Sequence, residues 1–394
     1  MRPVPTPSLA ILGTRGIPAR YGGFETFADE VSTRLVQRGV SVAVFCENDD
    51  PDAPKPATYR GVDLVYVPVP KLGPLSTIVH DLRCLWRARS AYDVVYMLGY
   101  GAALFCWLPR LFGTEVWINM DGIEWRRTKY GRLGRLWLRL MEAAAIRTPS
   151  RIVADADAVE ASLRRRHRRL PPCSVIPYGA PARPERPPEA PVRALGLLPG
   201  RYHLVVCRFE PENHVREIIE GYASSRSQRP LVVLGTARAE TPYVRALRRL
   251  AAADERVHML APIYDPERLT ALRYHACTYL HGHSVGGTNP SLVEALGCGN
   301  AVIAHDNPFN REVAGRGALY FTEASDVPNL VERLEADEQL RRQLGRDARR
   351  RQQERYTWDA VVADYLGLLG VEPDADKGEA VSTGSSAARA PSAG

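Results

Sequence analysis

The sequence predicts an α/β protein of two doubly wound domains, each built on a parallel sheet, that face each other across a cleft. Three observations support this fold class. The 394 residues exceed what one hydrophobic core usually organises. In both halves, short β-branched runs alternate with amphipathic helical stretches, which is the βαβ pattern. A proline-rich stretch lies between the halves.

Six apolar runs in each half predict the strands. In the first half they span residues 8–13, 40–46, 62–67, 94–98, 115–119 and 151–154. In the second half they span residues 203–207, 231–234, 257–260, 277–281, 301–304 and 318–321. Because strands that alternate with helices pair in parallel, we expect one parallel sheet in each half.

The domain boundaries follow from the segments around these strands. Prolines recur between residues 177 and 199 too often for a helix or a central strand, so we place a linker at 179–199. The domains then cover residues 1–178 and 200–355, and the second ends in a charged helical segment from about 327 to 355. An apolar-periodic stretch at 356–371 predicts a final docking helix, and the tail 372–394 is predicted to be disordered because it is too polar to pack.

Composition excludes several classes of protein. No apolar run approaches the roughly 20 residues of a membrane span, and the N-terminus lacks a signal-peptide pattern, so we expect a cytoplasmic protein. The seven cysteines are scattered and never in CxxC spacing, which indicates neither a disulfide framework nor a zinc site. We expect no nucleic-acid partner, and the oligomeric state stays open.

The net charge of +7 favours anionic partners. The densest basic run, residues 164–169, has two interpretations. It is a docking site for anionic lipid headgroups or glycan phosphates, or it is only a solvated helix end.

A glycine-rich loop follows the first predicted strand. It runs from Gly13 through Gly22 and Gly23 into a helix whose apolar face begins at Phe24. Such a loop lets backbone N–H groups approach phosphate oxygens, and the helix dipole adds attraction. The spacing matches neither the dinucleotide pattern GxGxxG nor the P-loop GxxxxGKS/T. The alternative interpretation is that the glycines only permit a tight turn.

A second glycine-rich loop follows the predicted strand at 277–281. Thr288 or Asn289 is placed to cap a short helix that has Pro290 at its first position. A pyrophosphate would bind the backbone N–H groups of residues 287–291. Glu294, one turn into the helix, would accept hydrogen bonds from the two hydroxyls of a ribose. The alternative for Glu294 is a solvent-facing helix acid.

Several motifs carry a family resemblance. The segment 281–303, with PSLVEA and GCGNAVI, resembles the donor-site signature of family-four retaining glycosyltransferases. The segment 207–213, CRFEPEN, is similar to the segment whose Arg and Lys hold the donor diphosphate in that family. The first glycine-rich loop together with the segment 121–127, DGIEWRR, resembles a bacterial polysaccharide-assembly subgroup that includes rhamnosyltransferases.

This resemblance covers most of the chain and implies the GT-B fold. In that fold two Rossmann-like domains face a cleft, the first binding the acceptor and the second the donor, and the final helix packs back on the first domain. The implied reaction moves a sugar from a nucleotide diphosphate to a glycan or lipid-linked glycan, with retention of configuration and without a metal or other cofactor. A lipid-linked acceptor implies peripheral contact with the anionic inner face of the cell membrane.

The chain departs from the family pattern at three positions. Gly286 stands where the wider family has a Glu that contacts the transferred sugar, and Asn213 stands where it has the diphosphate Lys. Asp121 replaces the usual His after the fifth strand. Because a 6-deoxy sugar offers different hydroxyls from glucose, the lost Glu predicts a donor such as dTDP-rhamnose.

The resemblance and the loops together assign the site residues. We expect Asp121, Arg208 and Glu294 to be catalytic, although an N-cap role is the alternative for Asp121. The predicted donor-binding residues are Gly22, Gly23, Asn213, His283, Gly286, Gly287, Thr288, Asn289, Pro290 and Ser291. The predicted acceptor-binding residues are Arg15, Arg20, Glu124 and Arg126.

Asp155 and Asp157 have the spacing of a DxD metal motif, but capping of the following helix accounts for both acids, and no metal site is predicted. Two other functions stay open. One is a nucleotide-sugar epimerase or phosphorylase of the same fold, although the second half lacks the lysine that a glycogen-type phosphorylase needs for its cofactor. The other is a noncatalytic nucleotide-sugar-binding protein, suggested by the missing Glu and Lys.

Overall fold

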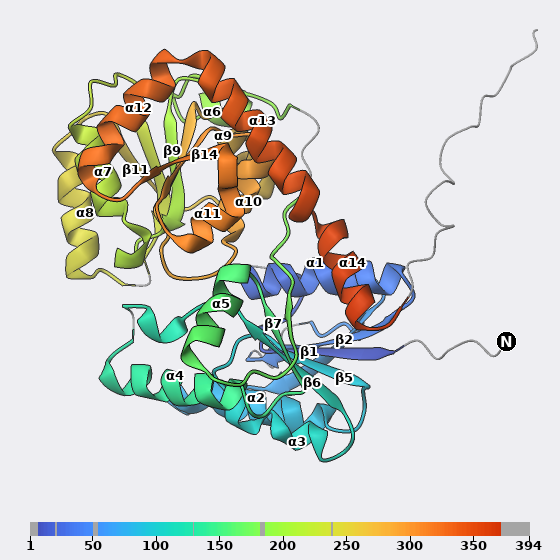
Figure 1. The fold of residues 1–394 in the computed structure, drawn as a ribbon. Coiled ribbons are helices and arrows are strands. Elements are labelled where there is room, and N and C mark those ends of the chain that lie inside the picture. The colour runs from blue at the N-terminus through green and yellow to red at the C-terminus, as the bar shows by residue number, and fades with distance from the viewer. Residues whose placement is uncertain are drawn as a thin grey trace, which may run out of the picture.

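The computed structural model describes residues 7–19, 22–49, 54–128, 130–181, 186–237 and 239–371. Figure 1 shows two domains stacked on each other, each with a central sheet between layers of helices. The predicted α/β fold of two parallel-sheet domains is confirmed. The predicted disordered tail, residues 372–394, and Arg20 lie outside the described residues.

The first sheet has eight strands in the order β3-β4-β2-β1-β5-β6-β7-β8. All neighbours pair in parallel except β3 and β4, which form an antiparallel edge. The prediction missed β3 and β8, since strands of two and three residues carry no periodicity. The strands are β1 (Ser8–Leu12), β2 (Ser41–Asn48), β3 (Thr58–Tyr59), β4 (Val62–Pro68), β5 (Val94–Met97), β6 (Glu115–Met120), β7 (Arg151–Ala154) and β8 (Cys173–Val175).

The second sheet has six parallel strands in the order β11-β10-β9-β12-β13-β14. They are β9 (His203–Arg208), β10 (Leu231–Thr236), β11 (Val257–Leu260), β12 (Thr278–His281), β13 (Val302–His305) and β14 (Ala318–Phe321). In both sheets the strand order reverses at one point, between β1 and β5 and between β9 and β12. Open parallel sheets bind ligands beyond the carboxyl ends of the strands at such points.

Helices cover both faces of each sheet. In the first domain these are α1 (Gly23–Gln37), α2 (Ser76–Ala88), α3 (Trp107–Arg110), α4 (Arg132–Ala145) and α5 (Asp157–Arg166). In the second domain they are α6 (Ala190–Arg193), α7 (Val215–Ala223), α8 (Pro242–Ala252), α9 (Pro266–Tyr274), α10 (Pro290–Gly297), α11 (Pro308–Ala314), α12 (Val327–Ala336) and α13 (Glu338–Arg355). None of the helices in the described ranges is long and apolar enough to cross a membrane.

The last helix, α14 (Trp358–Leu368), returns to the first domain and lies beside α1 (Figure 1). Trp358 packs edge-on against Tyr178 with ring centroids 4.9 Å apart. The hydroxyl of Tyr365 shares a hydrogen bond of 2.8 Å with the hydroxyl of Tyr96 inside the core. The chain therefore enters the second domain and leaves it again to complete the core of the first.

The structure corrects one sequence prediction about helices and refines another. The proline-rich stretch is not free of helix, because α6 forms with Pro191 in its first turn, where the missing N–H costs nothing. The charged segment 327–355 is helical as predicted, and it divides into two helices. Asp337 separates α12 from α13, and its side chain accepts a hydrogen bond from the backbone N–H of Leu340 as the N-cap of α13.

Candidate functional site

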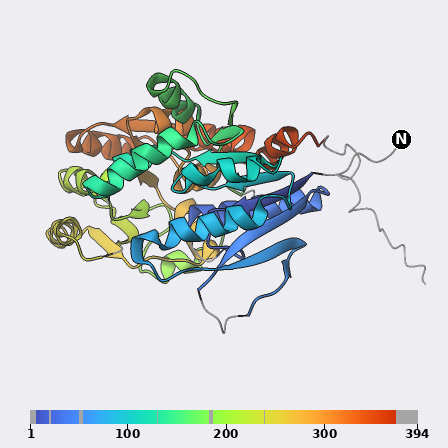
Figure 2. The same cartoon turned by 90° about the horizontal axis from the view of Figure 1, so that it is seen from below.

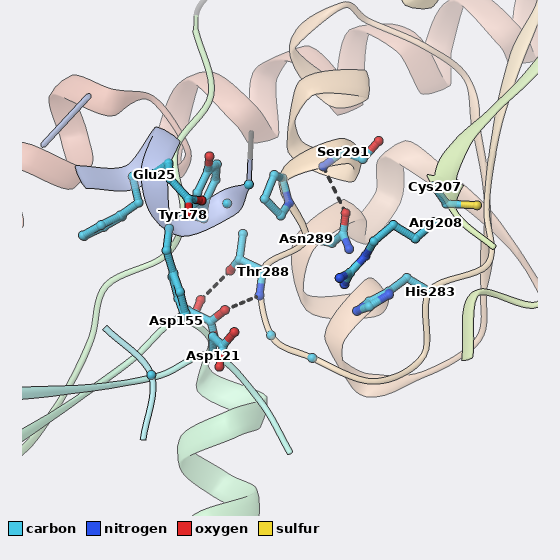
Figure 3. Close-up of a pocket in the computed structure, with 18 of the residues that line it drawn as sticks. Glu25, Asp121, Asp155, Tyr178, Cys207, Arg208, His283, Thr288, Asn289 and Ser291 are labelled. Carbon is cyan, nitrogen blue, oxygen red and sulfur yellow. Dashed lines mark hydrogen bonds between the residues drawn. The ribbon is translucent and has the colours of Figure 1, made fainter. Parts of the chain in front are cut away.

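A cleft of about 810 Å³ lies between the domains, where the ends of β1 and β5 face the ends of β9 and β12. Of the predicted site residues that the structure describes, all but Arg126 line this cleft. Figure 3 shows Arg208, His283 and Asn289 reaching into it from the second domain, with Asp121, Asp155, Glu25 and Tyr178 on the opposite side.

The loop after β6 and the two glycine-rich loops bring the domains into direct contact. A Cβ added at Gly122 would lie 2.5 Å from the Cα of Gly286, which only two glycines allow. A Cβ added at Gly23, the first residue of α1, would lie 3.9 Å from Cγ of Pro290, the first residue of α10. The N-termini of α1 and α10 therefore meet across the cleft.

Asp155 holds the second loop from the first domain. The backbone N–H of Thr288 donates to Oδ2 of Asp155 at 3.1 Å, and the Thr288 hydroxyl donates to the Asp155 carbonyl oxygen (Figure 3). Burial raises the pKa of Asp155 well above its usual range, and the nearby carboxylate of Asp121 raises it further. The predicted capping role is wrong for both acids, because α5 has Ala156 as its N-cap and Asp157 forms an ion pair of 2.9 Å with Arg355.

The N-terminus of α10 forms as predicted, but most of its backbone donors are in use. Asn289 caps the helix by accepting from the N–H of Ser291 at 3.0 Å, and Pro290 is the first helical residue. The N–H of Gly287 donates to the Asp121 carbonyl at 3.2 Å, and that of Thr288 to Asp155. In this structure the N–H groups of Gly287, Thr288 and Ser291 are therefore already hydrogen-bonded within the protein, which leaves fewer donors for a phosphate than the sequence indicates.

The N-terminus of α1 is the less occupied helix end in the cleft. Its N-cap is Gly22, with φ of 118°, a conformation that favours glycine. No side chain in the described ranges caps the helix, so its first N–H groups and its dipole face the cleft without a bound acceptor.

Arg208 ends β9 with its guanidinium in the cleft. This guanidinium forms no hydrogen bond or ion pair with any residue in the described part of the chain. The cleft's other internal arginines are engaged: Arg127 with Glu124 at 2.6 Å, and Arg273 with Glu294 at 2.7 Å. Arg208 is thus a cation that an incoming anion meets without breaking an ion pair with a described residue.

His283 and Asn213 form a polar pair beside Arg208. Oδ1 of Asn213 lies 2.6 Å from Nδ1 of His283, and Nδ2 of Asn213 donates to the Arg208 carbonyl at 2.6 Å. Because an amide oxygen only accepts, His283 carries its proton on Nδ1 and has a lone pair on Nε2. Burial, with His281, Arg127 and Arg208 nearby, lowers the pKa of His283 well below its usual range, so the ring is neutral.

An ion pair within the second domain holds the side chain of Glu294 in place. Arg273 is buried in the second domain, forms an ion pair with Glu294, and donates a hydrogen bond of 3.1 Å to Ser291 Oγ. The Ser291 hydroxyl also shares a hydrogen bond of 2.6 Å with Tyr279. Sequence reasoning missed Arg273, because an arginine inside a helix is usually a surface residue.

The acceptor side of the cleft differs from the prediction at one residue. Arg127, and not Arg126, lines the cleft, and its guanidinium lies 4.0 Å from Asp121. Arg126 is exposed with its guanidinium over the ring of Trp125, because the 3₁₀ turn Glu124–Arg126 directs it outward. Asp121 is not an N-cap, since this turn begins after Ile123. Arg15 lines the cleft and is exposed.

Two further groups of lining residues were not predicted. Tyr178 follows β8 and lines the cleft next to Glu25 (Figure 3). Pro262, Ile263 and Tyr264 follow β11 and line the second-domain wall with mostly apolar surface. Their position after a strand end was the only sequence signal, and it does not distinguish a lining loop from any other loop.

Two family models match the chain. Residues 7–181 match a domain of unknown function (DUF1972), and residues 214–367 match a model described as glycosyl transferase-like. No curated protein matches the sequence significantly.

Solved structures match almost the whole chain. Sucrose-phosphate synthase from Thermosynechococcus elongatus is 18% identical with a TM-score of 0.78, over 92% of this chain and 98% of that one. HepE from Anabaena in complex with UDP is 16% identical with a TM-score of 0.73, over 93% and 100%. A UDP-forming α,α-trehalose-phosphate synthase from Burkholderia vietnamiensis is 13% identical with a TM-score of 0.71, over 93% and 100%. This chain therefore has the GT-B fold, and its residues 214–367 match a model described as glycosyl transferase-like.

Proposed function

We propose that this chain is a retaining glycosyltransferase that transfers a 6-deoxy sugar, L-rhamnose from dTDP-rhamnose, to a glycan or lipid-linked glycan during polysaccharide assembly. One observation carries the proposal: the guanidinium of Arg208 lies without a partner among the described residues in a cleft that Glu294 also lines. HepE, of the same fold, has been solved with UDP-glucose, which supports a nucleotide sugar as the donor.

In this proposal the donor diphosphate lies between Arg208 and the N-terminus of α1. Arg208 supplies a full positive charge. The backbone N–H groups at the start of α1, which no described side chain caps, supply hydrogen bonds, and the helix dipole adds attraction. Glu294 accepts from the ribose hydroxyls, and its ion pair with Arg273 fixes the carboxylate for that contact. Charge that develops on the leaving phosphate is stabilised by these groups, and neither a metal nor another cofactor is assigned a role.

His283 takes the place of the missing Glu in contacting the donor sugar. Its ring occupies the space in which a side chain at position 286 would begin, since a Cβ there would lie 2.8 Å from Nε2. Asn213 orients the ring so that Nε2 accepts a hydrogen bond from a sugar hydroxyl. The two departures, Gly286 and Asn213, thus both serve the placement of His283.

Transfer with retention needs no protein nucleophile. The acceptor oxygen bonds to the anomeric carbon on the face from which the phosphate leaves, and the leaving phosphate takes the acceptor's proton. Asp121 lies at the end of β6 beside Arg127 and positions a hydroxyl of the acceptor or of the sugar. Closure of the domains excludes water and limits hydrolysis of the donor.

A panel of donors tests the proposal. Release of dTDP, UDP or GDP is measured with a lipid-linked monosaccharide acceptor for dTDP-rhamnose, UDP-glucose and GDP-mannose. We expect acceptor-dependent release from dTDP-rhamnose only. Similar turnover of dTDP-rhamnose and UDP-glucose would contradict the 6-deoxy assignment, and tight donor binding without release would favour a noncatalytic binding protein.

A further inference from the structure

One face of the first domain exposes an unusual amount of apolar surface. Among the described residues, all the exposed large apolar side chains except Leu198 and Tyr264 lie between residues 72 and 140. The most exposed are Leu133 at 84% and Leu111 at 70%. Monomeric proteins rarely leave large apolar patches open, so such a face marks an interaction site.

These side chains come from helices on a single face of the first sheet. The buried sides of α2 and α4 pack on one side of the sheet, whereas α1 and α14 pack on the other. In the view from below (Figure 2), the blue α2 and the green-blue α4 lie in front of the sheet. The short α3 contacts α2, and the 3₁₀ turn Ala103–Phe105 just before it contacts α4.

Ring contacts make part of this face continuous. Trp86 of α2 lies edge-on to Phe112, just after α3, with ring centroids 6.4 Å apart. The guanidinium of Arg89 lies over both rings, 4.1 Å from the centroid of Trp86. Trp137 of α4 donates from its indole N–H to the carbonyl of Gly101, which precedes α3. We call this surface of α2, α3 and α4 the lower face.

The exposed charges of the lower face are all positive. Along α4, Leu133, Leu136 and Leu140 form one exposed stripe, and Arg132, Arg135 and Arg139 form a second stripe beside it. None of these three arginines forms an ion pair with a residue that the structure describes. The acids of α2 and α4, Asp81 and Glu142, are both buried. A helix with leucines and arginines on its outer side is typical of the membrane interface.

We propose that the lower face docks on an anionic lipid bilayer, with the leucines and tryptophans among the acyl chains and the arginines at the lipid phosphates. A second copy of the chain fits this face poorly, because two lower faces would bring rows of arginines together. If the proposed function holds, the same segments serve the acceptor, since Gly101, Tyr130 and Leu138 line the cleft just above this face.

The basic run at residues 164–169 fits a membrane less well. Arg164 pairs with Glu160 at 2.6 Å and Arg166 pairs with Glu142 at 3.1 Å, so part of its charge is compensated. None of the exposed large apolar side chains of the described residues belongs to this run. The lower face combines charge with apolar anchors, and the run offers charge alone.

Vesicle co-sedimentation of the full chain tests this proposal. Vesicles of phosphatidylcholine mixed with the anionic lipid phosphatidylglycerol are compared with vesicles of pure phosphatidylcholine. We expect binding to the anionic vesicles only. A triple variant Leu133→Ser, Leu136→Ser and Leu140→Ser and a triple variant Arg132→Gln, Arg135→Gln and Arg139→Gln should each bind about tenfold more weakly or worse.

Two control variants test whether binding belongs to the lower face. Leu198→Ser removes an exposed leucine of the second domain, and Arg165→Gln with Arg168→Gln and Arg169→Gln neutralises the basic run; both should bind as the parent chain does. Equal melting temperatures show that the leucine variant is folded. Unchanged vesicle binding by both α4 variants would overturn the proposal. It would also be overturned if the parent chain sedimented as a dimer and only the leucine variant sedimented as a monomer. Because the assay needs neither donor nor acceptor, its result is independent of the proposed reaction.

Discussion

The backbone N–H of Thr288 donates a hydrogen bond to Oδ2 of Asp155 at 3.1 Å, and this bond joins the loop after β12 to the end of β7 in the other domain. The Thr288 hydroxyl adds a second bond to the carbonyl of Asp155. Both residues are buried. The first domain therefore sets the shape of the loop that begins the predicted donor site.

Replacing Asp155 should loosen that loop. Asp155→Ala leaves the buried N–H of Thr288 without its acceptor, which costs about 1–3 kcal/mol. We expect a lower melting temperature and weaker donor binding by calorimetry. Asp155→Asn keeps an acceptor oxygen and should retain most of both. The matched control is Asp157→Asn on the same turn, whose side chain is 58% exposed; an equal effect in the control would contradict a specific role for Asp155.

Asp155→Asn should also change how stability depends on pH. Because burial raises the pKa of Asp155 in the folded chain, the folded state keeps a proton that the unfolded state loses. This residue therefore makes the free energy of unfolding fall as pH rises above about 4, until its folded pKa is passed. Urea titrations at several pH values should show that the Asn variant lacks this decline; identical pH profiles would mean that Asp155 ionises normally.

Arg208→Ala and Glu294→Ala should each abolish transfer. Loss of the free cation removes stabilisation of the leaving diphosphate, and loss of Glu294 removes the ribose contact. Arg208→Lys, which keeps the charge but not the planar fork, should retain a small part of the activity. Acceptor-dependent release of nucleoside diphosphate measures all three, with the exposed Arg201→Ala of the second domain as the control. Full activity in either alanine variant would contradict the assignment of the donor site.

Gly286→Ala should impair the proposed transfer, and Gly286→Glu should not restore the wider family's sugar contact. A Cβ at this position meets His283 at 2.8 Å, and the φ of 146° is one that other residues rarely adopt, a strain of about 1–3 kcal/mol. We expect kcat/KM to fall by roughly one to two orders of magnitude. Gly367→Ala on α14 is the control, since this exposed residue does not line the cleft and its Cβ meets nothing within 4 Å. Glucose transfer by the Glu variant would refute this role of Gly286.

The fold was accessible to sequence reasoning because it depends on local pattern. Buried parallel strands are continuous apolar runs between amphipathic helices, and α14 shows the same apolar periodicity. The site depended on partners distant in the chain. Asp155 and Thr288 are 133 residues apart, and nothing near Asp155 distinguishes a helix cap from a bond across the cleft. Arg126 likewise points away from the cleft because of a single 3₁₀ turn, which the neighbouring sequence does not predict.

The backbone donors of the second loop show the same limit. A motif predicts that N–H groups gather at the start of α10, and they do. Whether those groups are available depends on the carbonyl of Asp121 and the carboxyl of Asp155, which belong to the other domain. Local sequence therefore predicts the position of a phosphate seat, whereas the packing of the two domains decides how many of its donors are free.

Acid should unfold the chain through histidines that are held neutral around β12 and β13. Burial lowers the pKa of His281 to about 3 and that of His305 to about 4, and His283 is lowered as well. Between pH 6.5 and 4 the unfolded chain binds protons that the folded chain does not, so stability falls as pH falls. The buried His281 adds a slope of up to about 1.4 kcal/mol per pH unit to the plot of unfolding free energy against pH. Asp155, whose pKa is raised, contributes a slope of opposite sign for one proton. His281→Gln should flatten the plot of unfolding free energy against pH by one proton, even if it lowers the absolute value. The control is the substitution His258→Gln at an exposed position of β11, which should leave the slope unchanged. Parallel plots for the parent chain and His281→Gln would contradict the prediction, because they would mean that His281 binds its proton equally well in the folded and the unfolded chain.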